Sequence, residues 1–278
     1  MFTNYHLYFD KFFLSNFFCI ITYGTAGFVN TMLMKKSSAE LKNFTLDNRS
    51  WRCFSMKGCL LIHGYTGGPF EVEPLAQRLQ NEGFYTLCPI LHGHGGIRKN
   101  LRYSSCEKWM KSVEDAYIEL SKQSDEITII GYSMGGLLTF QLAHKYKPKC
   151  IVTMSTPIYC IDFKNLKEDL LLKIRMRDVQ RLKEYFYSCF TPMVANLNFR
   201  ILLHHSKRLI PQLDMPAMIV QGKKDPIVKA KSAQFIYNEI PSNEKELYYY
   251  ENSNHQLHYS SEKDMIYENI IRFVKQYG

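Results

Sequence analysis

The sequence GYSMGG, Gly131 to Gly136, places one serine among three glycines directly after the apolar run EITII. A serine hydroxyl can attack a carbonyl carbon when a base takes its proton. The pattern G-x-S-x-G between a strand and a helix is typical of a sharp turn that lifts the serine above a sheet. The flanking glycines at 131 and 135 are then needed because side chains there would collide with the neighbouring helix and strand. A glycine-rich turn with a capping serine is the alternative, and the strand and helix on either side favour a nucleophile at Ser133.

A serine nucleophile needs a base, and the base needs a carboxylate that orients it. Asp225 in QGKKDPIV follows one predicted strand, and His255 in NSNHQLH follows another, later in the chain. Both positions lie at the carboxyl ends of strands, the same edge of a parallel sheet as Ser133. His258 and Asp214 are competing candidates. His258 lies nearer the following helix and Asp214 precedes a strand, so we favour His255 and Asp225.

An attacked carbonyl also needs N–H donors for its negative oxygen. The Met134 N–H, at the start of the helix after the serine, is one candidate. The glycine-rich loop HGYTGGPFE, residues 63–71, follows the first strand of the domain, and the Tyr65 N–H is the second candidate. We interpret His63 as a buried histidine that shapes this loop. His92 and His94 in LHGHG have no nearby carboxylate cluster, so we expect a structural loop there rather than a metal site.

The elements that must position these residues alternate between strand and helix after Met56. Apolar runs at 58–64, 85–90, 126–131 and 149–157 predict strands, and the segments 215–225 and 245–255 each predict a strand followed by a loop. Amphipathic patterns at 69–84, 109–123, 135–146, 231–240 and 264–277 predict helices. This alternation is typical of a mostly parallel sheet with helices on both faces. Residues 158–213 have helical patterns without a convincing strand, so we expect a small helical cap inserted there.

Composition narrows the class of protein. The chain has 278 residues, 46% hydrophobic and 22% charged, which is enough to bury a sizeable core. Its net charge of +9 is scattered, and no nucleic-acid-binding motif occurs, so we expect no nucleic-acid partner. Its eight cysteines form no C-x-x-C pair or zinc pattern, which favours reduced thiols in a cytoplasmic protein. We expect neither a metal nor an organic cofactor.

The first 56 residues have a different character. No charged residue occurs from Phe12 to Met34, a stretch long enough to cross a membrane but diluted by polar residues. Three hypotheses remain open for residues 1–56. They are a membrane anchor through residues 12–34, a loosely packed extension, and translation from a start upstream of a functional Met56.

From Lys57 to its end, the chain resembles a known family. HGYTGG, GHG, Trp109 before a helix, GYSMGG, IVTMSTP, QGKKDPIV and NSNH occur in the order found in α/β hydrolases of the bacterial carboxylesterase and monoacylglycerol lipase group. The resemblance implies the α/β-hydrolase fold over residues 57–278 and a helical cap that matches residues 158–213. It also implies a catalytic triad of Ser133, Asp225 and His255, with an oxyanion hole from the N–H groups of Tyr65 and Met134.

The function that the residues and the resemblance together predict is hydrolysis of carboxylic esters through an acyl-enzyme. Short- to medium-chain acyl esters or monoacylglycerols are the expected substrates, because the predicted cap is rich in apolar residues that can line an acyl pocket. The basic cap and the N-terminal segment are also compatible with substrates at a membrane surface, and this alternative remains open. Two alternatives also remain: an acyltransferase or thioesterase that uses the same triad, and a non-catalytic binding protein that has kept the fold.

Overall fold

The computed structural model describes residues 18–25, 28–35, 56–95, 98–160 and 192–278. The chain divides into two compact units, residues 1–54 and residues 55–278. The division falls close to the boundary expected at residues 56 and 57.

The first unit contains a two-stranded antiparallel sheet. Strand β1 (Phe18–Thr25) pairs with β2 (Phe28–Lys35), with Thr25 opposite Phe28 in the register. The described part of residues 12–34, the segment proposed above as an anchor, is therefore extended. Across the described residues, none of the helices combines the length and the apolar character that crossing a membrane requires.

The second unit is built on a six-stranded sheet in which every neighbouring pair is parallel, in the order β4-β3-β5-β6-β7-β8. The strands are β3 (Lys57–Ile62), β4 (Tyr85–Leu87), β5 (Glu126–Tyr132), β6 (Cys150–Met154), β7 (Ala217–Gly222) and β8 (Lys245–Tyr250). Each lies within or overlaps a predicted strand, because buried parallel strands are short continuous apolar runs. The predicted parallel sheet is confirmed.

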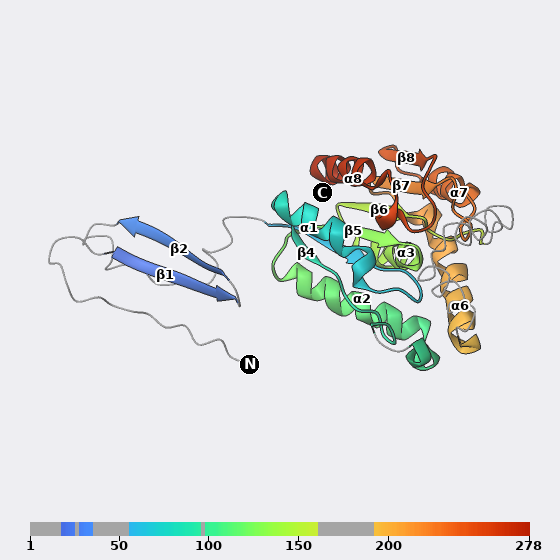
Figure 1. Ribbon diagram of the computed structural model, residues 1–278, viewed down its shortest axis with the longest axis horizontal. Helices are drawn as coiled ribbons and strands as arrows, with labels where there is room; N and C mark the ends of the chain where they lie inside the picture. Colours follow the sequence, from blue (N-terminus) through green and yellow to red (C-terminus); the bar gives the residue numbers. More distant parts are fainter. Residues whose placement is uncertain (1–17, 26–27, 36–55, 96–97, 161–191) are drawn as a thin grey trace. The chain divides into compact units, whose positions relative to one another are not determined.

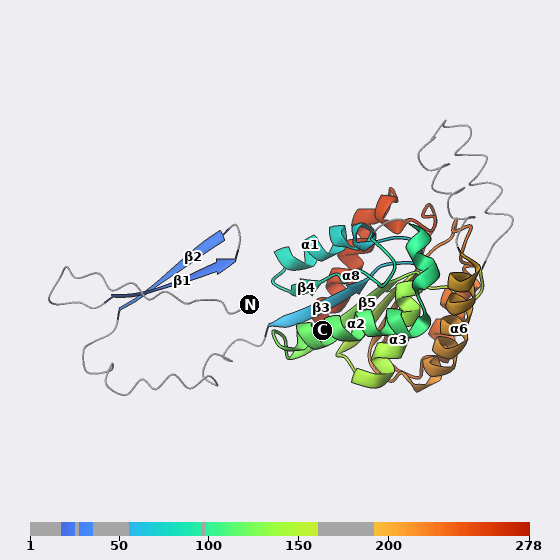
Figure 2. The ribbon, with the colours of Figure 1, turned by 90° about the horizontal axis from the view of Figure 1, so that it is seen from below.

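The described helices of this unit surround the sheet. They are α1 (Glu73–Asn81), α2 (Cys106–Ser121), α3 (Met134–Tyr146), α6 (Met193–Leu209), α7 (Lys231–Glu239) and α8 (Lys263–Tyr277). α1 and α8 pack on one face, and α2, α3 and α7 pack on the other (Figures 1 and 2). α6 packs against α3 and α2, so it lies outside the layer that touches the sheet.

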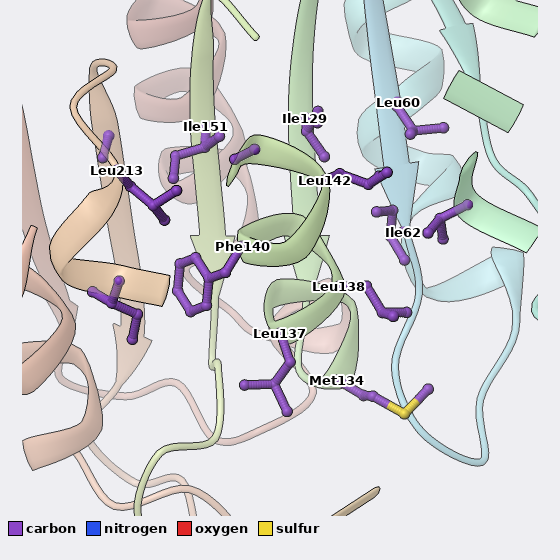
Figure 3. Close-up of a cluster of buried hydrophobic side chains, with 14 of the residues drawn as sticks. Leu60, Ile62, Ile129, Met134, Leu137, Leu138, Phe140, Leu142, Ile151 and Leu213 are labelled. Atoms are coloured by element: carbon purple, nitrogen blue, oxygen red, sulfur yellow. The ribbon is translucent and has the colours of Figure 1, made fainter. Parts of the chain in front are cut away.

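α3, which follows the serine, is the most deeply buried of these helices. Leu137, Leu138, Phe140 and Leu142 are all inaccessible to solvent. In Figure 3, Leu138 lies on the side of Ile62 while Phe140 points to the opposite side of the helix. A helix that is apolar around most of its circumference belongs in the interior. Its first turn is thereby held rigidly against the sheet.

Only part of the predicted cap is described. Residues 161–191 lie outside the described residues, and with them the following candidates for an acyl pocket: Phe163, Leu166, Leu170, Leu171, Phe186 and Phe190. α6 and the short 3-10 helix at Ile210–Gln212 account for most of the rest of residues 158–213. This described part is helical, as the sequence predicts.

Candidate active site

Ser133 occupies a strained turn between β5 and α3. Its φ of 52° and ψ of −118° lie in a region that non-glycine residues rarely adopt, at a cost of about 1–3 kcal/mol. A Cβ at Gly131 would lie 2.3 Å from Thr139 Oγ1 of α3, and one at Gly135 would lie 2.1 Å from the carbonyl oxygen of Ile62 in β3. The glycines are therefore needed for the close packing of helix and strand that the sequence predicts at these two positions.

Three side chains from separate loops meet above this turn. His255 Nε2 lies 3.1 Å from Ser133 Oγ, and His255 Nδ1 lies 2.8 Å from Asp225 Oδ2. Ser133 follows β5, Asp225 follows β7 and His255 follows β8, so all three lie at the carboxyl edge of the sheet. The structure brings together the three residues that sequence reasoning selected as nucleophile, acid and base.

The carboxylate of Asp225 is buried and fully engaged. Its Oδ1 accepts the N–H groups of Ile227 and Val228, both at 2.8 Å, and its Oδ2 accepts from Gln221 Nε2 at 3.1 Å as well as from His255. Donors on both oxygens fix the direction in which Oδ2 faces the imidazole. Sequence reasoning missed Gln221, although it begins the QGKKD motif and its buried position at the end of β7 is the available signal.

The loop that carries His255 is fixed by its backbone. Tyr132, next to the serine, donates its hydroxyl hydrogen to the His255 carbonyl oxygen at 2.9 Å. Burial, with the nearby Glu71 and Asp225, raises the pKa of the Tyr132 phenol well above its ordinary value, so it stays a donor. A Cβ at Gly222 would lie 2.4 Å from the Ser253 carbonyl oxygen, so this glycine lets the end of β7 approach the same loop.

The loop after β3 lies directly against the serine. A Cβ at Gly64 would lie 3.2 Å from Ser133 Cβ, which places the next residue, Tyr65, beside the nucleophile. Within the described part of the chain, the Tyr65 N–H donates to no other residue. Met134 is the first residue of α3, where N–H groups have no partner inside the helix. Both predicted oxyanion donors therefore belong to backbone that adjoins Ser133.

His63 and His94 are structural parts of this loop region. His63 is fully buried, donates from Nδ1 to the Gly64 carbonyl oxygen at 2.9 Å and accepts the Leu91 N–H on Nε2 at 3.2 Å. His94 Nε2 accepts the Thr66 N–H at 3.3 Å. Burial lowers the pKa of both histidines to about 4. The interpretation of His63 as a buried, loop-shaping residue is confirmed, and His94 has a comparable role.

The competing candidates lie elsewhere. Asp214 is mostly exposed before β7 and pairs with Lys147 at 3.8 Å. The His258 ring packs against Tyr132 and Tyr259, with ring centroids 5.8 Å and 4.2 Å away. Neither takes the place of Asp225 or His255 beside Ser133.

The thiols and the possible metal ligands do not add a second centre to the described residues. Cys59, Cys88, Cys106, Cys150 and Cys160 are free, and burial raises the pKa of Cys150 to about 12. Over the same residues, no three side chains of histidine, cysteine, aspartate or glutamate gather closely enough to hold a metal ion.

α6 contacts the loop that follows β3. The Tyr65 hydroxyl donates to Asn196 Oδ1 at 3.1 Å, and the Tyr65 ring stacks on Phe199 with centroids 5.2 Å apart. Met193 and Leu197, on the same helix, are exposed. The described end of the cap therefore places an aromatic side chain, Phe199, against the residue whose N–H adjoins the nucleophile.

Comparison with known proteins finds relatives over most of the chain. Residues 60–197 match the family model described as the alpha/beta hydrolase fold, and residues 197–264 match the model described as serine aminopeptidase, S33. A carboxylesterase of Bacillus subtilis (strain 168) is 27% identical, over 79% of this chain and 93% of its own length. A thermostable monoacylglycerol lipase of Bacillus sp. (strain H-257) is 28% identical, over 80% and 91%.

A solved structure from work on the metagenome-derived lipolytic enzymes LipS and LipT superimposes with a TM-score of 0.68 at 24% identity. The match covers 80% of this chain and 94% of that one. With the parallel sheet and the strand–serine–helix turn, these findings define the class: the chain is an α/β hydrolase. Within that superfamily it belongs with the esterase- and lipase-type enzymes.

Proposed function

We propose that this protein is a serine hydrolase that cleaves carboxylic esters through a covalent acyl-enzyme. The observation that carries the proposal is the continuous hydrogen-bonded series from Ser133 through His255 to Asp225, built on a strained turn. A buried carboxylate that faces an imidazole, which in turn faces a serine hydroxyl, is the arrangement that serine acyl transfer requires.

The chemistry begins with a proton transfer. Nδ1–H of His255 donates to Asp225, so Nε2 is left to accept the Ser133 hydroxyl proton as Oγ attacks the ester carbonyl carbon. Asp225 keeps this tautomer and stabilises the imidazolium that forms. The imidazolium then protonates the departing alcohol. Water attacks the acyl-enzyme in the same way, losing its proton to His255, and the acid is released with Ser133 restored.

The negative oxygen of each tetrahedral intermediate needs donors that are already in place. In our proposal the N–H groups of Tyr65 and Met134 bind it, because both belong to backbone that adjoins Ser133. Loss of one such donor costs about 10²–10³ in turnover in other serine hydrolases.

The substrates that we propose are short- to medium-chain acyl esters or monoacylglycerols. Two observations support an uncharged acyl group. Tyr65 and Phe199 form an aromatic pair next to the nucleophile loop, and α6 exposes Met193 and Leu197. The relatives named a carboxylesterase and a monoacylglycerol lipase point to the same substrate class.

The test is hydrolysis of a series of p-nitrophenyl esters with acyl chains from two to sixteen carbons, together with a monoacylglycerol. We expect measurable turnover with a maximum at short or medium length, and loss of turnover in Ser133→Ala. Ser133→Ala with wild-type turnover, or a wild-type protein that cleaves none of these esters, would refute the proposal. Adding methanol to the same assay measures acyl transfer, and a transfer rate well above hydrolysis would instead indicate an acyltransferase.

A further inference from the structure

Glu71, whose side chain turns back into the loop after β3, has no part in the chemistry described so far. Its carboxylate Oε2 accepts the Gly64 N–H at 2.8 Å, seven residues back along the chain. The residue ends a short 3-10 helix (Pro69–Glu71), in which the Glu71 N–H donates to the Gly68 carbonyl oxygen at 3.1 Å. The next residue, Val72, is fully buried and anchors this turn in the core.

The loop is shaped around this carboxylate. A Cβ at Gly67 would lie 2.1 Å from Glu71 Oε2, so only glycine leaves room for the carboxylate there. A Cβ at Gly64 would lie 3.3 Å from Glu71 Oε2 and 3.2 Å from Ser133 Cβ. The carboxylate and the nucleophile therefore both lie close to the position that a side chain at residue 64 would occupy.

We propose that Glu71 is a positioning residue for the oxyanion hole. By binding the Gly64 N–H it fixes the His63–Gly64 peptide, which directly precedes the peptide that carries the Tyr65 N–H, and so restrains the direction of the Tyr65 N–H. The inference rests on the proposed esterase function, in which that N–H binds the oxyanion. In this role Glu71 acts through the backbone.

An oxyanion hole must be preorganised to be effective. Hydrogen bonds to a developing oxyanion help catalysis only when the donor is already aimed, and a displacement of about 1 Å can cost about 10² in rate. Glycines at 64, 67 and 68 leave this loop little intrinsic stiffness. A charge-assisted hydrogen bond is roughly twice as strong as a neutral one, so the carboxylate supplies the missing stiffness.

The test compares Glu71→Ala with Glu71→Gln on a p-nitrophenyl ester that the wild type cleaves. Glu71→Ala removes the acceptor, and we expect kcat to fall about 10- to 100-fold while KM changes less than about threefold. Glu71→Gln keeps an acceptor of the same shape, so we expect kcat within about fivefold of wild type. Glu73→Ala is the matched control, because Glu73 is an exposed glutamate two residues on, and its kcat should be unchanged.

Gly67→Ala tests the same contact from the other side. Its Cβ would displace the carboxylate, so we expect a fall in kcat similar to that of Glu71→Ala. In the double variant Gly67→Ala/Glu71→Ala the Cβ has room, so the loss should exceed that of Glu71→Ala by no more than about twofold. If Glu71→Ala does not fold, Gly67→Ala decides the question alone.

The outcomes separate this inference from the proposed function. A kcat for Glu71→Ala or Gly67→Ala within twofold of wild type, or a double variant whose losses multiply, overturns the role of Glu71 and leaves the esterase proposal standing. A wild-type protein that hydrolyses no ester overturns both.

Discussion

Ser133 Oγ and His255 Nε2 lie 3.1 Å apart although 122 positions separate them in the chain. In the sheet, β5 and β8 are not neighbours, because β6 and β7 lie between them. Asp225, in the loop after β7, bridges the gap by holding His255 Nδ1 at 2.8 Å. The distance between the hydroxyl and the imidazole therefore depends on the order of the strands, and three loops of one sheet edge determine it together.

Asp225→Asn should lower kcat by about 10⁴-fold with little change in fold, because an amide NH₂ can turn toward Nδ1 and favour the wrong imidazole tautomer. The measurement is ester hydrolysis at saturating substrate, with circular dichroism to check the fold. Asp214→Asn is the control, since Asp214 is an exposed aspartate before the same strand, and it should retain wild-type kcat. Equal losses in the two variants would contradict the assignment of Asp225.

Gln221→Leu should destabilise the protein by about 1–3 kcal/mol. The buried oxygens of Asp225 and Gly222 lose a hydrogen-bond donor, and no water replaces it. Gln221 is fully buried, and its Nε2 donates to Asp225 Oδ2 at 3.1 Å and to the Gly222 carbonyl oxygen at 3.0 Å. Urea unfolding monitored by fluorescence gives the free energy of unfolding. The same change at the exposed Gln234 on α7 should shift it by less than about 0.5 kcal/mol, and matching losses at the two positions would count against this role for Gln221.

Stability should decrease in mild acid, in part because of His63. Burial lowers the pKa of folded His63 to about 4 from its ordinary value of 6.5. Between these values the unfolded chain binds more protons, so the contribution of His63 is complete above pH 6.5 and is lost as pH falls toward 4. The slope of unfolding free energy against pH in this window contains up to about 1.4 kcal/mol per pH unit from one such histidine.

His63→Gln should reduce this slope by up to about 1.4 kcal/mol per pH unit, whatever its effect on stability at neutral pH. The measurement is urea unfolding at several pH values from 4.5 to 7.5. His205→Gln, at an exposed position on α6, should leave the slope unchanged. An unaltered slope in His63→Gln would show that His63 takes up its proton equally easily in the folded state.

The strained backbone at Ser133 predicts an inverted order of stability between two inactive variants. Glycine in a helix or strand is usually about 1 kcal/mol less stable than alanine. At the φ of 52° found here glycine carries no steric cost, so Ser133→Gly should be more stable than Ser133→Ala by about 1 kcal/mol. Both variants lose the hydroxyl, so the difference between their free energies of unfolding in urea reports the cost of the backbone conformation. A more stable alanine variant would show that the turn is not strained.

The strands, the helices of the second unit and the positions of Ser133, Asp225 and His255 could be predicted because local signals define them. The apolar runs fix β3, β5, β6 and β7, and the chain order serine, acid, histidine then selects loops on one edge of the sheet. Glycines at 131 and 135 also predict close packing of the neighbouring helix and strand, and the structure has that packing.

The roles of Gln221, Tyr132 and Glu71 could not be predicted, because each acts through a contact between separate loops or across a folded-back loop. A glutamine after an apolar run and a glutamate in a turn are common, and their partners follow only from the tertiary arrangement. The N-terminal segment is a further case. Its uncharged stretch is compatible with several structures, and the described part forms the strands β1 and β2.

The most direct test of the central claim is covalent labelling of the folded protein with a fluorophosphonate, followed by peptide mass spectrometry. Our account predicts one equivalent of phosphonate on Ser133, with labelling slowed strongly in His255→Ala and absent in Ser133→Ala. A folded wild-type protein that hydrolyses esters without labelling at Ser133, or that labels at another serine, would contradict it.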